Sequence, residues 1–496
     1  MGQGVTVHVP LNRVEGDLEI TTRLEGGVVA EAWASGTMFR GFERILAGRG
    51  ALDGLVITPR ICGICSTSHL TAAARALDQI AGVTVPPDAQ RIRNLALMAE
   101  HIQSDLRHGF LMFTPDFVRP DHRALPLYQE ACRRYPPLEG TTVLETIRET
   151  KRVLELVAIL GGQWPHSSFM VPGGVVGVPS DADLQQCRLL LRQYRQWYER
   201  RVLGCPLERW LAVDSADALT AWLDESAAHR DGELGFYVRF ARQAGLETIG
   251  RGPGNFLSFG SLDLPADTQV RAPDGGRQLV PAGFARGVVV APFDQTRIAE
   301  HVAFSWFADQ EGGRHPAQGE TIPYATGNES DKYSWAKAPR YDGLPAETGP
   351  LAEMVVAGKP LFVDWIGRYG PSAFVRELAR LVRPAELMPA MATWLEETRE
   401  SGAFYTPPGR LVDGVGFGLT HAARGALGHW VELKDGAIAR YQVITPTAWN
   451  ASPRDASGLR GPIEEALVGT PADSPEAVSL GHVVRSFDPC LVCTVH

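Results

Sequence analysis

Two C-x-x-C pairs stand at opposite ends of this 496-residue chain, Cys62-Gly63-Ile64-Cys65 near the start and Cys490-Leu491-Val492-Cys493 just before the final residue, His496. Thiolates three positions apart can bind one metal ion, because a turn between them brings both sulfurs to the same side. Gly63 relieves crowding in the first turn, and Pro489 fixes the backbone ahead of the second pair. The pairs form one four-sulfur site only if the fold brings the two ends together.

Four thiolates suit zinc, an iron–sulfur cluster or a redox metal such as nickel, and the number of sulfurs does not choose among them. A protein scaffold held by structural zinc is the simplest alternative. Zinc sites built from two pairs usually keep them within roughly 15–20 residues, whereas most of this chain separates Cys65 from Cys490. The other cysteines, Cys132, Cys187 and Cys205, lack metal-binding spacing and are interpreted as small buried apolar residues.

Composition excludes several classes of protein. The net charge is −9, with mixed signs and no long basic run, so we expect no nucleic-acid partner. No apolar run approaches the roughly 18 residues of a membrane span, and no export signal opens the chain. Seven cysteines, four of them in metal-like pairs, do not resemble a disulfide framework. We predict a cytoplasmic protein, or one held at the inner face of a membrane through a partner.

Both cysteine pairs must be positioned by helices and strands, and the sequence patterns predict an α+β fold that is mainly α. A central bundle of long helices should carry small peripheral antiparallel sheets, with both cysteine pairs meeting at a buried metal site. We expect one large domain, 1–496, whose parts are an N-terminal sheet (about 1–60), a helical core (about 66–245 and 371–400), a loop-rich insert (about 250–370) and a C-terminal part of strands and helices (about 410–496).

Local patterns support this architecture. Alternating apolar residues from Leu18 to Leu24 predict a half-buried strand that Gly26-Gly27 turns back. Ser68 is a candidate cap for a helix ending at Gly82, and apolar residues at helical spacing over 92–113 predict a longer one. Two helices are expected near 371–384 and 387–400. Asp435-Gly436 between apolar runs is a strong hairpin signal.

The motifs together resemble the large subunit of a nickel–iron hydrogenase. Besides the R-x-C-G-x-C and D-P-C-x-x-C pairs, the matching motifs are Arg13-Val14-Glu15-Gly16, Arg40-Gly41-Phe42-Glu43, Gly161-Gly162-Gln163-Trp164-Pro165-His166, Ala423-Arg424-Gly425 and Pro446-Thr447-Ala448-Trp449-Asn450. They run the whole length of the chain, so chance does not account for them. The resemblance implies an enzyme that cleaves H2 reversibly into protons and electrons, with the uptake direction favoured.

The resemblance also implies the ligands of the metals. All four cysteines would bind nickel, with Cys62 and Cys490 as terminal ligands, while Cys65 and Cys493 would also bridge to an iron that carries one carbon monoxide and two cyanides. Cyanide nitrogens need hydrogen-bond donors in a dry pocket, and the motifs assign this task to Arg424 and Thr447.

Heterolytic cleavage of H2 releases a proton that needs a base. By resemblance, the sulfur of Cys490 takes it and passes it to Glu15. Arg424 has an electrostatic role, because a guanidinium resists deprotonation, with Asp488 as its counter-charge. The family usually has an Asp-His pair where this chain has Ser104-Asp105. Asp105 is therefore interpreted either as a member of this charged group or as an acid on a helix surface.

The same resemblance gives the end of the chain two further roles. Glu43 and His496 would bind magnesium or another divalent ion beneath the active site. Family precursors carry an extension that is cleaved after this histidine once nickel is inserted. We therefore expect the sequence ending at His496 to be a processed form.

Departures from the family pattern narrow the subgroup. Asp17 stands where histidine is common, and His421-Ala422-Ala423 replaces the common Glu-Ala-Pro. Both changes are more typical of cytoplasmic uptake and hydrogen-sensing relatives. His69, four residues after Cys65, is typical of uptake enzymes, whereas sensors tend to have glutamine there, although a histidine that merely packs in the core would remove this distinction. The alternatives are a sensor that signals to a kinase and a respiratory complex I relative, which would lack the cysteine pairs.

The chain has no spare cysteine motif for an electron relay. The resemblance therefore implies an obligate heterodimer with an iron–sulfur small subunit that receives the electrons. H2 and protons are the expected small-molecule substrates.

Overall fold

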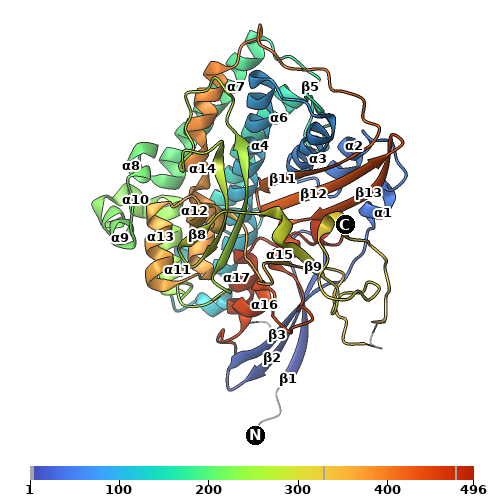
Figure 1. The fold of residues 1–496 in the computed structure, drawn as a ribbon. Coiled ribbons are helices and arrows are strands. Elements are labelled where there is room, and N and C mark those ends of the chain that lie inside the picture. Colours follow the sequence, from blue (N-terminus) through green and yellow to red (C-terminus); the bar gives the residue numbers. More distant parts are fainter. Residues whose placement is uncertain (1–4, 328–329, 475–476) are drawn as a thin grey trace.

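The N-terminal sheet forms one end of the computed structural model, which describes residues 5–327, 330–474 and 477–496. Its strands β1 (Val5–Leu11), β2 (Leu18–Glu25) and β3 (Val28–Gly36) are antiparallel in the order β1-β2-β3 (Figure 1). Leu18 and Ile20 are buried and pack against residues of the C-terminal part, including Val483 and Phe487. The predicted half-buried strand is confirmed, and its buried face packs the N-terminal sheet against the C-terminal part of the chain.

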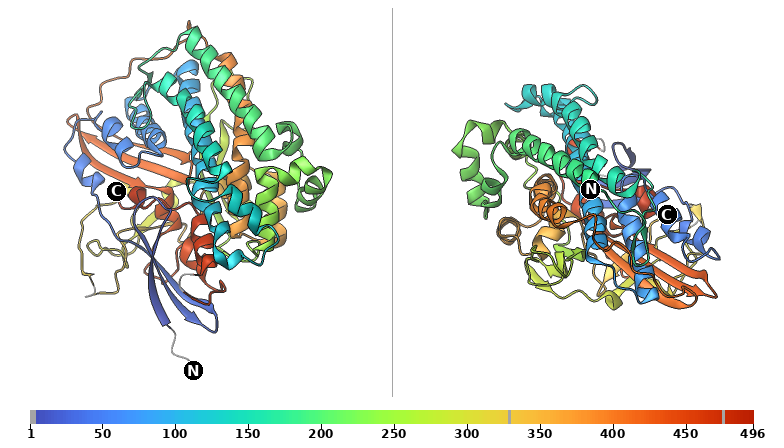
Figure 2. Two further views of the ribbon diagram at one scale, coloured as in Figure 1. Left: turned by 180° about the vertical axis from the view of Figure 1, so that it is seen from behind. Right: turned by 90° about the horizontal axis from the view of Figure 1, so that it is seen from above.

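A bundle of long helices forms the core, as the apolar spacing predicted. It contains α4 (Pro87–Arg107), α6 (Thr141–Gly161), α7 (Asp181–Trp197) and α14 (Ala373–Glu397), which lie alongside one another (Figures 1 and 2). The helix expected over 92–113 is present, because α4 continues without a break into a π-helical turn, η2 (His108–Phe113). The mainly helical fold class is therefore confirmed.

Two details of the helix predictions are wrong. Helix α3 (Ser66–Ala81) begins at Ser66 rather than after a Ser68 cap, because the carboxylate of Glu100 on α4 accepts hydrogen bonds from the backbone N–H groups of Thr67 and Ser68. The two helices expected over 371–400 are one helix, α14, which runs through Pro384 and Pro389. Buried side chains on both sides of these prolines hold the helix together despite the missing N–H groups.

The segment 250–370 carries its own regular structure. Strands β6 (Asn255–Asp263), β7 (Gln278–Arg286) and β8 (Val289–Ala291) form a second antiparallel sheet, β9 (Ile298–His301) pairs with β10 (Ala338–Tyr341), and α12 (Pro350–Val356) and α13 (Pro360–Tyr369) follow. The shorter elements elsewhere are α1 (Phe42–Leu46), α2 (Gly54–Ile57), α5 (Tyr128–Arg134), β4 (Met170–Val171), β5 (Gly174–Val175), α8 (Leu207–Leu211), α9 (Ala216–Glu225), α10 (Ala227–Asp231) and α11 (Glu233–Gln243).

A third antiparallel sheet, β11 (Gly414–Ala422), β12 (Gly425–Lys434) and β13 (Ala437–Ile444), covers α3. Asp435 and Gly436 join β12 to β13 with φ of 52° and 77°, which confirms the predicted hairpin. The chain then forms α15 (Pro446–Asn450), α16 (Pro462–Leu467), α17 (Val478–Ser486) and α18 (Leu491–Thr494).

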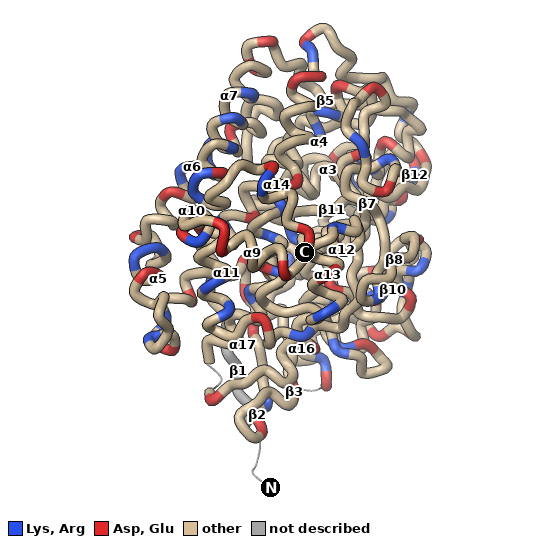
Figure 3. Tube along the Cα trace, turned by 90° about the vertical axis from the view of Figure 1, so that its left-hand side faces the viewer, with Lys and Arg blue, Asp and Glu red and all other residues tan. Residues whose placement is uncertain are grey.

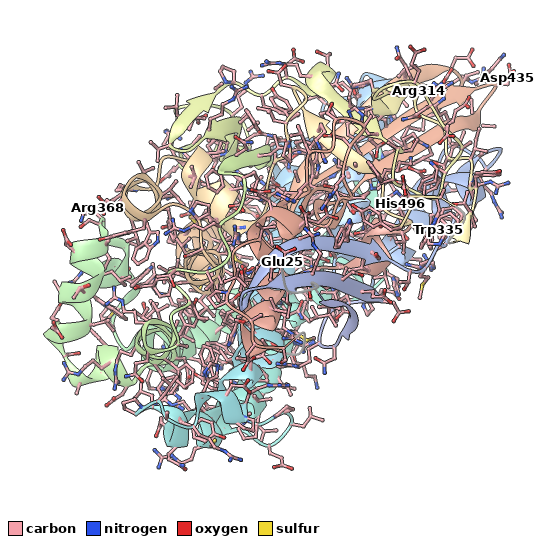
Figure 4. All side chains as sticks on the ribbon, turned by 90° about the horizontal axis from the view of Figure 1, so that it is seen from below. Glu25, Arg314, Trp335, Arg368, Asp435 and His496 are labelled. Atoms are coloured by element: carbon pink, nitrogen blue, oxygen red, sulfur yellow. The ribbon has the colours of Figure 1, made fainter. Side chains whose placement is uncertain are left out.

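The C-terminus lies inside the molecule, whereas the N-terminal sheet reaches outward (Figure 1). His496 is 8% exposed and lies among other side chains near Trp335, while Asp435 and Arg368 lie at the periphery (Figure 4). Backbone hydrogen bonds hold the tail in place, including Arg40 N–H to Val495 O at 2.9 Å. Burying the tail brings the two cysteine pairs together.

Acidic and basic residues are interspersed along the chain (Figure 3). Within the described residues, no helix combines the length and apolar character needed to cross a lipid bilayer.

Candidate metal centre

The four sulfurs of the two cysteine pairs converge at one buried point. The Sγ–Sγ distances are 2.8 Å between Cys490 and Cys493, 3.3 Å between Cys65 and Cys493 and 3.7 Å between Cys62 and Cys490. All four cysteines are at most 5% exposed and none is in a disulfide. Four free sulfurs at these distances are suited to sharing metal ions, since thiolates this close repel each other unless a cation lies between them.

The first strand region supports the C-terminal pair through its backbone. Glu15 N–H donates to Pro489 O at 3.3 Å, and Leu491 N–H donates to Glu15 O at 2.6 Å. A Cβ on Gly16 would lie 2.9 Å from Val492 N, and Gly16 has a φ of 82°, so only glycine fits this approach. The motif predicted around Glu15 therefore lies directly beside Cys490.

The N-terminal pair lies at the start of α3. Cys65 precedes the first turn of α3. In that turn the N–H groups of Thr67 and Ser68 donate to the carboxylate of Glu100 on α4 at 2.7 and 2.9 Å. Arg40 donates to Val492 O at 3.0 Å and also to Ile61 O, so its side chain spans the two cysteine turns. The helix, its acidic partner and Arg40 together fix the position of the first sulfurs.

The thiols titrate differently from one another. Hydrogen bonds from the other three cysteines hold the pKa of the Cys62 thiol well below its usual range. Contact with Cys490 raises the pKa of Cys65, and burial raises that of Cys493. One thiolate is thus stabilised by its neighbours, while further negative charge requires a cation. A metal bound by all four sulfurs would displace the remaining protons.

On one side of the sulfurs lies a group of buried charges. Asp488 Oδ1 is 3.0 Å from Arg424 Nε and 2.9 Å from His108 Nδ1, and Asp488 Oδ2 is 3.7 Å from Arg380 Nε. Although burial opposes ionisation, Arg424 and His108 hold the pKa of Asp488 well below its usual range. The predicted pairing of Arg424 with Asp488 is present in the structure.

Two of the predicted donors are suited to polar ligands of a bound metal. Arg424 Nη1 is buried and has no hydrogen-bond partner within the described residues. Its guanidinium also feels the charges of Cys490, Cys62 and Cys65, which help to raise the pKa of Arg424 well above its usual range despite burial. Thr447 Oγ1 accepts from Cys490 N–H at 2.9 Å and keeps its own proton to donate. A buried unpaired donor beside four sulfurs fits a metal centre that carries acceptor groups.

Asp105 belongs to the buried charges around Arg424, but it contacts Arg383 rather than Arg424 itself. It is 1% exposed, which excludes a helix-surface acid. In the described structure its two oxygens bind Arg383 at 2.7 and 2.8 Å rather than Arg424. Arg383 also donates to Ala423 O at 2.7 Å, so Asp105 supports the backbone next to Arg424 indirectly, through Arg383. Burial raises the pKa of Asp105 to about 6 even with Arg383 beside it.

Glu15 is half-buried. Burial raises the pKa of Glu15, Arg424 opposes that change, and Cys62 and Asp488 add to it. A carboxyl whose pKa lies above its ordinary value keeps a proton to higher pH, which suits a group that must take up a proton before passing it on.

A row of uncharged polar side chains also lies beside the sulfurs. A ring nitrogen of His69 is within 4.8 Å of the sulfurs of Cys65 and Cys493. His69 Nδ1 is 3.1 Å from His429 Nε2, and His429 Nδ1 is 2.8 Å from the hydroxyl of Tyr441. Burial lowers the pKa of His69 to about 3 and also lowers that of His429, so both rings are neutral.

Glu43 and His496 meet in a second small site under the tail. His496 Nδ1 is 2.6 Å from Cys493 O, and its Nε2 is 3.3 Å from Glu43 Oε1. Lys337 Nζ lies 3.3 Å from Glu43 Oε2 and 3.8 Å from Glu300 Oε2, beside a cavity of about 10 Å³. Burial alone would raise the pKa of Glu43, but Lys337 and His496 hold it at about 2.

The donors of this second site fit a small cation. If His496 Nδ1 donates to Cys493 O, its Nε2 presents a lone pair to a carboxylate oxygen of Glu43. Two acceptors facing each other need a proton or a cation between them. Carboxylate oxygens and one imidazole form a suitable donor set for a divalent ion, with Lys337 as an additional neighbour.

Several members of the centre were missed from the sequence. His108, Arg380 and Arg383 surround Asp488 and Asp105, and Lys337 joins Glu43 and His496. The signal for His108 was its place on the predicted long helix, three residues after Asp105. The others are charged residues on elements distant in sequence, and no local pattern distinguishes them from exposed charges.

Comparison with known proteins agrees with this geometry. Residues 40–124 and 238–496 match the family model described as "Nickel-dependent hydrogenase". The chain is 32% identical to the large subunit of the periplasmic [NiFeSe] hydrogenase of Desulfomicrobium baculatum, covering 98% of this chain and 94% of that one, and 27% identical to the uptake hydrogenase large subunit of Rhizobium leguminosarum bv. viciae, with the same coverage. The reduced Ni-Fe-Se hydrogenase of D. vulgaris Hildenborough superimposes with a TM-score of 0.82 at 31% identity, covering 99% of this chain and all of that one.

Proposed function

Because this chain belongs to the large subunits of the nickel-dependent hydrogenase family, we propose that its four cysteine sulfurs hold a nickel–iron centre. The chain is the catalytic subunit of a hydrogenase and its reaction is the cleavage of H2. The convergence of four free, buried sulfurs from the two ends of the chain is the observation that carries the proposal. When bound, the centre supplies the metals at which H2 is cleaved heterolytically.

In the proposed assignment Cys62 and Cys490 are terminal nickel ligands, and Cys65 and Cys493 bridge nickel to iron. The iron would carry one carbon monoxide and two cyanides. Arg424, with its unpaired Nη1, and Thr447, with its spare hydroxyl proton, would donate hydrogen bonds to the cyanides.

The proposed route for protons runs from Cys490 to Glu15. The Glu15 backbone is bonded to the residues on either side of Cys490, so this residue lies beside the C-terminal cysteine turn. Its raised pKa favours uptake of a proton from the sulfur. Arg424 stays protonated and holds Asp488 in place beside the sulfurs.

The proposed ion site under the tail is formed by Glu43 and His496. Magnesium or a similar divalent ion would link the first helix of the chain to its last residue. Through the bond between His496 and Cys493 O, that ion would also help to keep the C-terminal sulfurs in position.

The homologues are large subunits, so a small subunit is the partner of this chain. We propose that this partner carries iron–sulfur clusters and receives the electrons, and that H2 uptake is the physiological direction. The similarity to the uptake hydrogenase large subunit of R. leguminosarum supports this direction over hydrogen sensing, as does His69. Cytoplasmic location remains a prediction from the sequence, with a periplasmic protein among the relatives.

The test of the cofactor is metal analysis and infrared spectroscopy of the purified heterodimer. We expect nickel and iron, with absorption bands from metal-bound carbon monoxide and cyanide. One zinc ion with no such bands would overturn the assignment and favour a structural scaffold.

The test of the proton route is Glu15→Gln, which keeps the shape of the side chain but cannot take a proton. H2 oxidation should fall by roughly 10²–10⁴-fold, because one positioned acid–base group contributes about that much. Nickel and iron contents should not change. Asp17→Asn, an exposed carboxyl two residues away, is the matched control and should keep full activity. Full activity in Glu15→Gln would show that protons leave by another route.

A further inference from the structure

A row of three uncharged, buried side chains leads away from the bridging sulfurs. His69 on α3, His429 on β12 and Tyr441 on β13 are 1%, 0% and 3% exposed. Successive polar atoms are 3.1 and 2.8 Å apart, and the two imidazole rings have centroids 5.3 Å apart. The proton route proposed above uses none of these residues.

The direction of the protons along this row can take only two forms. A neutral imidazole has one N–H and one lone pair, so when one nitrogen donates the other must accept. His69 Nδ1 is engaged with His429, which leaves Nε2 as the nitrogen available to the sulfurs of Cys65 and Cys493. Every donor in the row therefore points either toward the sulfurs or away from them.

We propose that Tyr441 and His429 are positioning residues that fix the tautomer of His69, so that its Nε2–H donates to the bridging sulfurs. The inference rests on the proposed metal centre, because sulfurs that bind metals are thiolates and therefore only accept. A lone pair of His69 facing them would leave the thiolates without a donor and would add repulsion in a site from which water is excluded. His69 Nδ1 then accepts from His429 Nε2–H, and His429 Nδ1 accepts from the Tyr441 hydroxyl.

Tyr441 is the end of the row and decides its direction. Its hydroxyl proton goes either inward to His429 or outward to Thr58, whose Oγ1 interacts with the phenol. Thr58 donates to Gly54 O at 2.8 Å, so its oxygen is the acceptor that an outward-pointing Tyr441 proton would use. Donation from Tyr441 to Thr58 would reverse the direction of every hydrogen bond in the row and leave His69 Nε2 without a proton.

The packing holds the phenol in this position. A Cβ on Gly54, the first residue of α2, would lie 3.2 Å from Tyr441 Cε2 and 3.6 Å from its hydroxyl. The ring therefore occupies space that any larger residue would take. The rings of His429 and Tyr441 also meet edge to face, with centroids 5.5 Å apart and planes at 70°.

The main test is Tyr441→Phe in the purified heterodimer, read by the infrared bands of the iron-bound diatomic ligands. Without the terminal donor His429 loses its preferred tautomer and the N–H donation to the sulfurs weakens. More electron density then stays on the sulfurs and iron, so the carbon monoxide and cyanide bands should move to lower wavenumber. The reduction potential of the nickel should fall in parallel.

Tyr198→Phe is the matched control, since Tyr198 is equally buried and its hydroxyl donates to Leu381 O at 2.9 Å, outside the row. This variant should leave the bands in place although it too loses a buried hydrogen bond. Nickel content and unfolding midpoint of both variants show whether they fold and load metal.

Thr58→Val separates the two directions. If Tyr441 donates inward, removing the outer acceptor leaves the bands unshifted. If Tyr441 donates outward, Thr58→Val shifts them, and the proposed direction is overturned. Bands of Tyr441→Phe identical to those of the wild type would overturn the positioning role itself. Absence of diatomic bands from the wild type would instead refute the cofactor assignment.

Discussion

Two buried regions of different character lie beside the sulfurs. On the charged side, Arg424, Asp488 and Arg380 interact, with His108 and the Asp105–Arg383 pair around them. On the neutral side, His69, His429 and Tyr441 form a single row without a formal charge. Both regions are buried, yet one is held by complementary charge and the other by the direction of each proton.

The difference has a physical reason. A buried ion is tolerated only with a partner of opposite charge, and removing one partner typically costs about 3–5 kcal/mol because the other charge remains. A neutral hydrogen bond contributes only about 0.5–1.5 kcal/mol to stability, but it fixes the orientation of the donor relative to the acceptor. The charged side thus fixes where groups stand, and the neutral side fixes which way a hydrogen bond points.

The largest expected effect is on the charged side, from Asp488→Asn. Asparagine fits the positive φ of 51° at this position but leaves Arg424 without its carboxylate, while Arg380 keeps Glu377 at 3.0 Å. The free energy of unfolding should fall by about 3–5 kcal/mol in urea titrations, with a loss of H2 oxidation. Asp217→Asn, whose exposed carboxylate pairs with Arg368, should change stability by less than about 0.5 kcal/mol.

Acid should affect the contributions of His69 and Asp488 over different pH ranges. The pKa of His69 is about 3 in the folded chain and near 6.5 when unfolded, so its contribution to stability is lost as pH falls below 6.5. His69→Gln should remove roughly 2–3 kcal/mol of the destabilisation measured between pH 7 and 4.5. Asp488 has a lowered pKa, so its stabilisation is lost only below about pH 4, the unfolded value. An equal change in slope for Asp488→Asn between pH 7 and 4.5 would contradict this division.

A smaller effect is expected from Asp105→Asn, at the outer edge of the charged side. Arg383 would keep Glu353 as a partner at 3.0 Å, so no guanidinium is left without a carboxylate. We expect a loss of about 1–3 kcal/mol in the free energy of unfolding, with most of the H2 oxidation activity retained. A loss as large as that of Asp488→Asn would mean that the two carboxylates act as one unit.

The smallest effect is expected on the neutral side, from Gly54→Ala. The added methyl presses on the Tyr441 ring, while alanine in place of glycine favours the helix by roughly 0.5–1 kcal/mol. The free energy of unfolding should therefore change by less than about 1 kcal/mol. The infrared bands should shift slightly in the direction expected for Tyr441→Phe, and no shift would show that small movements of the phenol do not reach the sulfurs.

The parts of the fold that could be predicted from the sequence are mostly those that depend on local patterns. Alternation in β2, the turn at Asp435-Gly436 and the helical spacing over 92–113 depend on neighbours in sequence, and the structure confirms each of them. The predicted start of α3 was wrong because a distant carboxylate binds its first N–H groups. The predicted break within α14 was wrong because tertiary packing overrode the local signal of the prolines.

For the metal centre, the sequence by itself indicated the candidate residues: two cysteine pairs as ligands, Glu15 and Arg424 in recognisable motifs beside them, and a histidine at the final position. Only the tertiary structure decided what surrounds them. Asp105 pairs with Arg383, Lys337 joins Glu43, and Tyr441 reaches His69 through His429. Motif spacing is local and is written in the chain, whereas the partner of a buried charge and the direction of a hydrogen bond depend on which distant elements pack together.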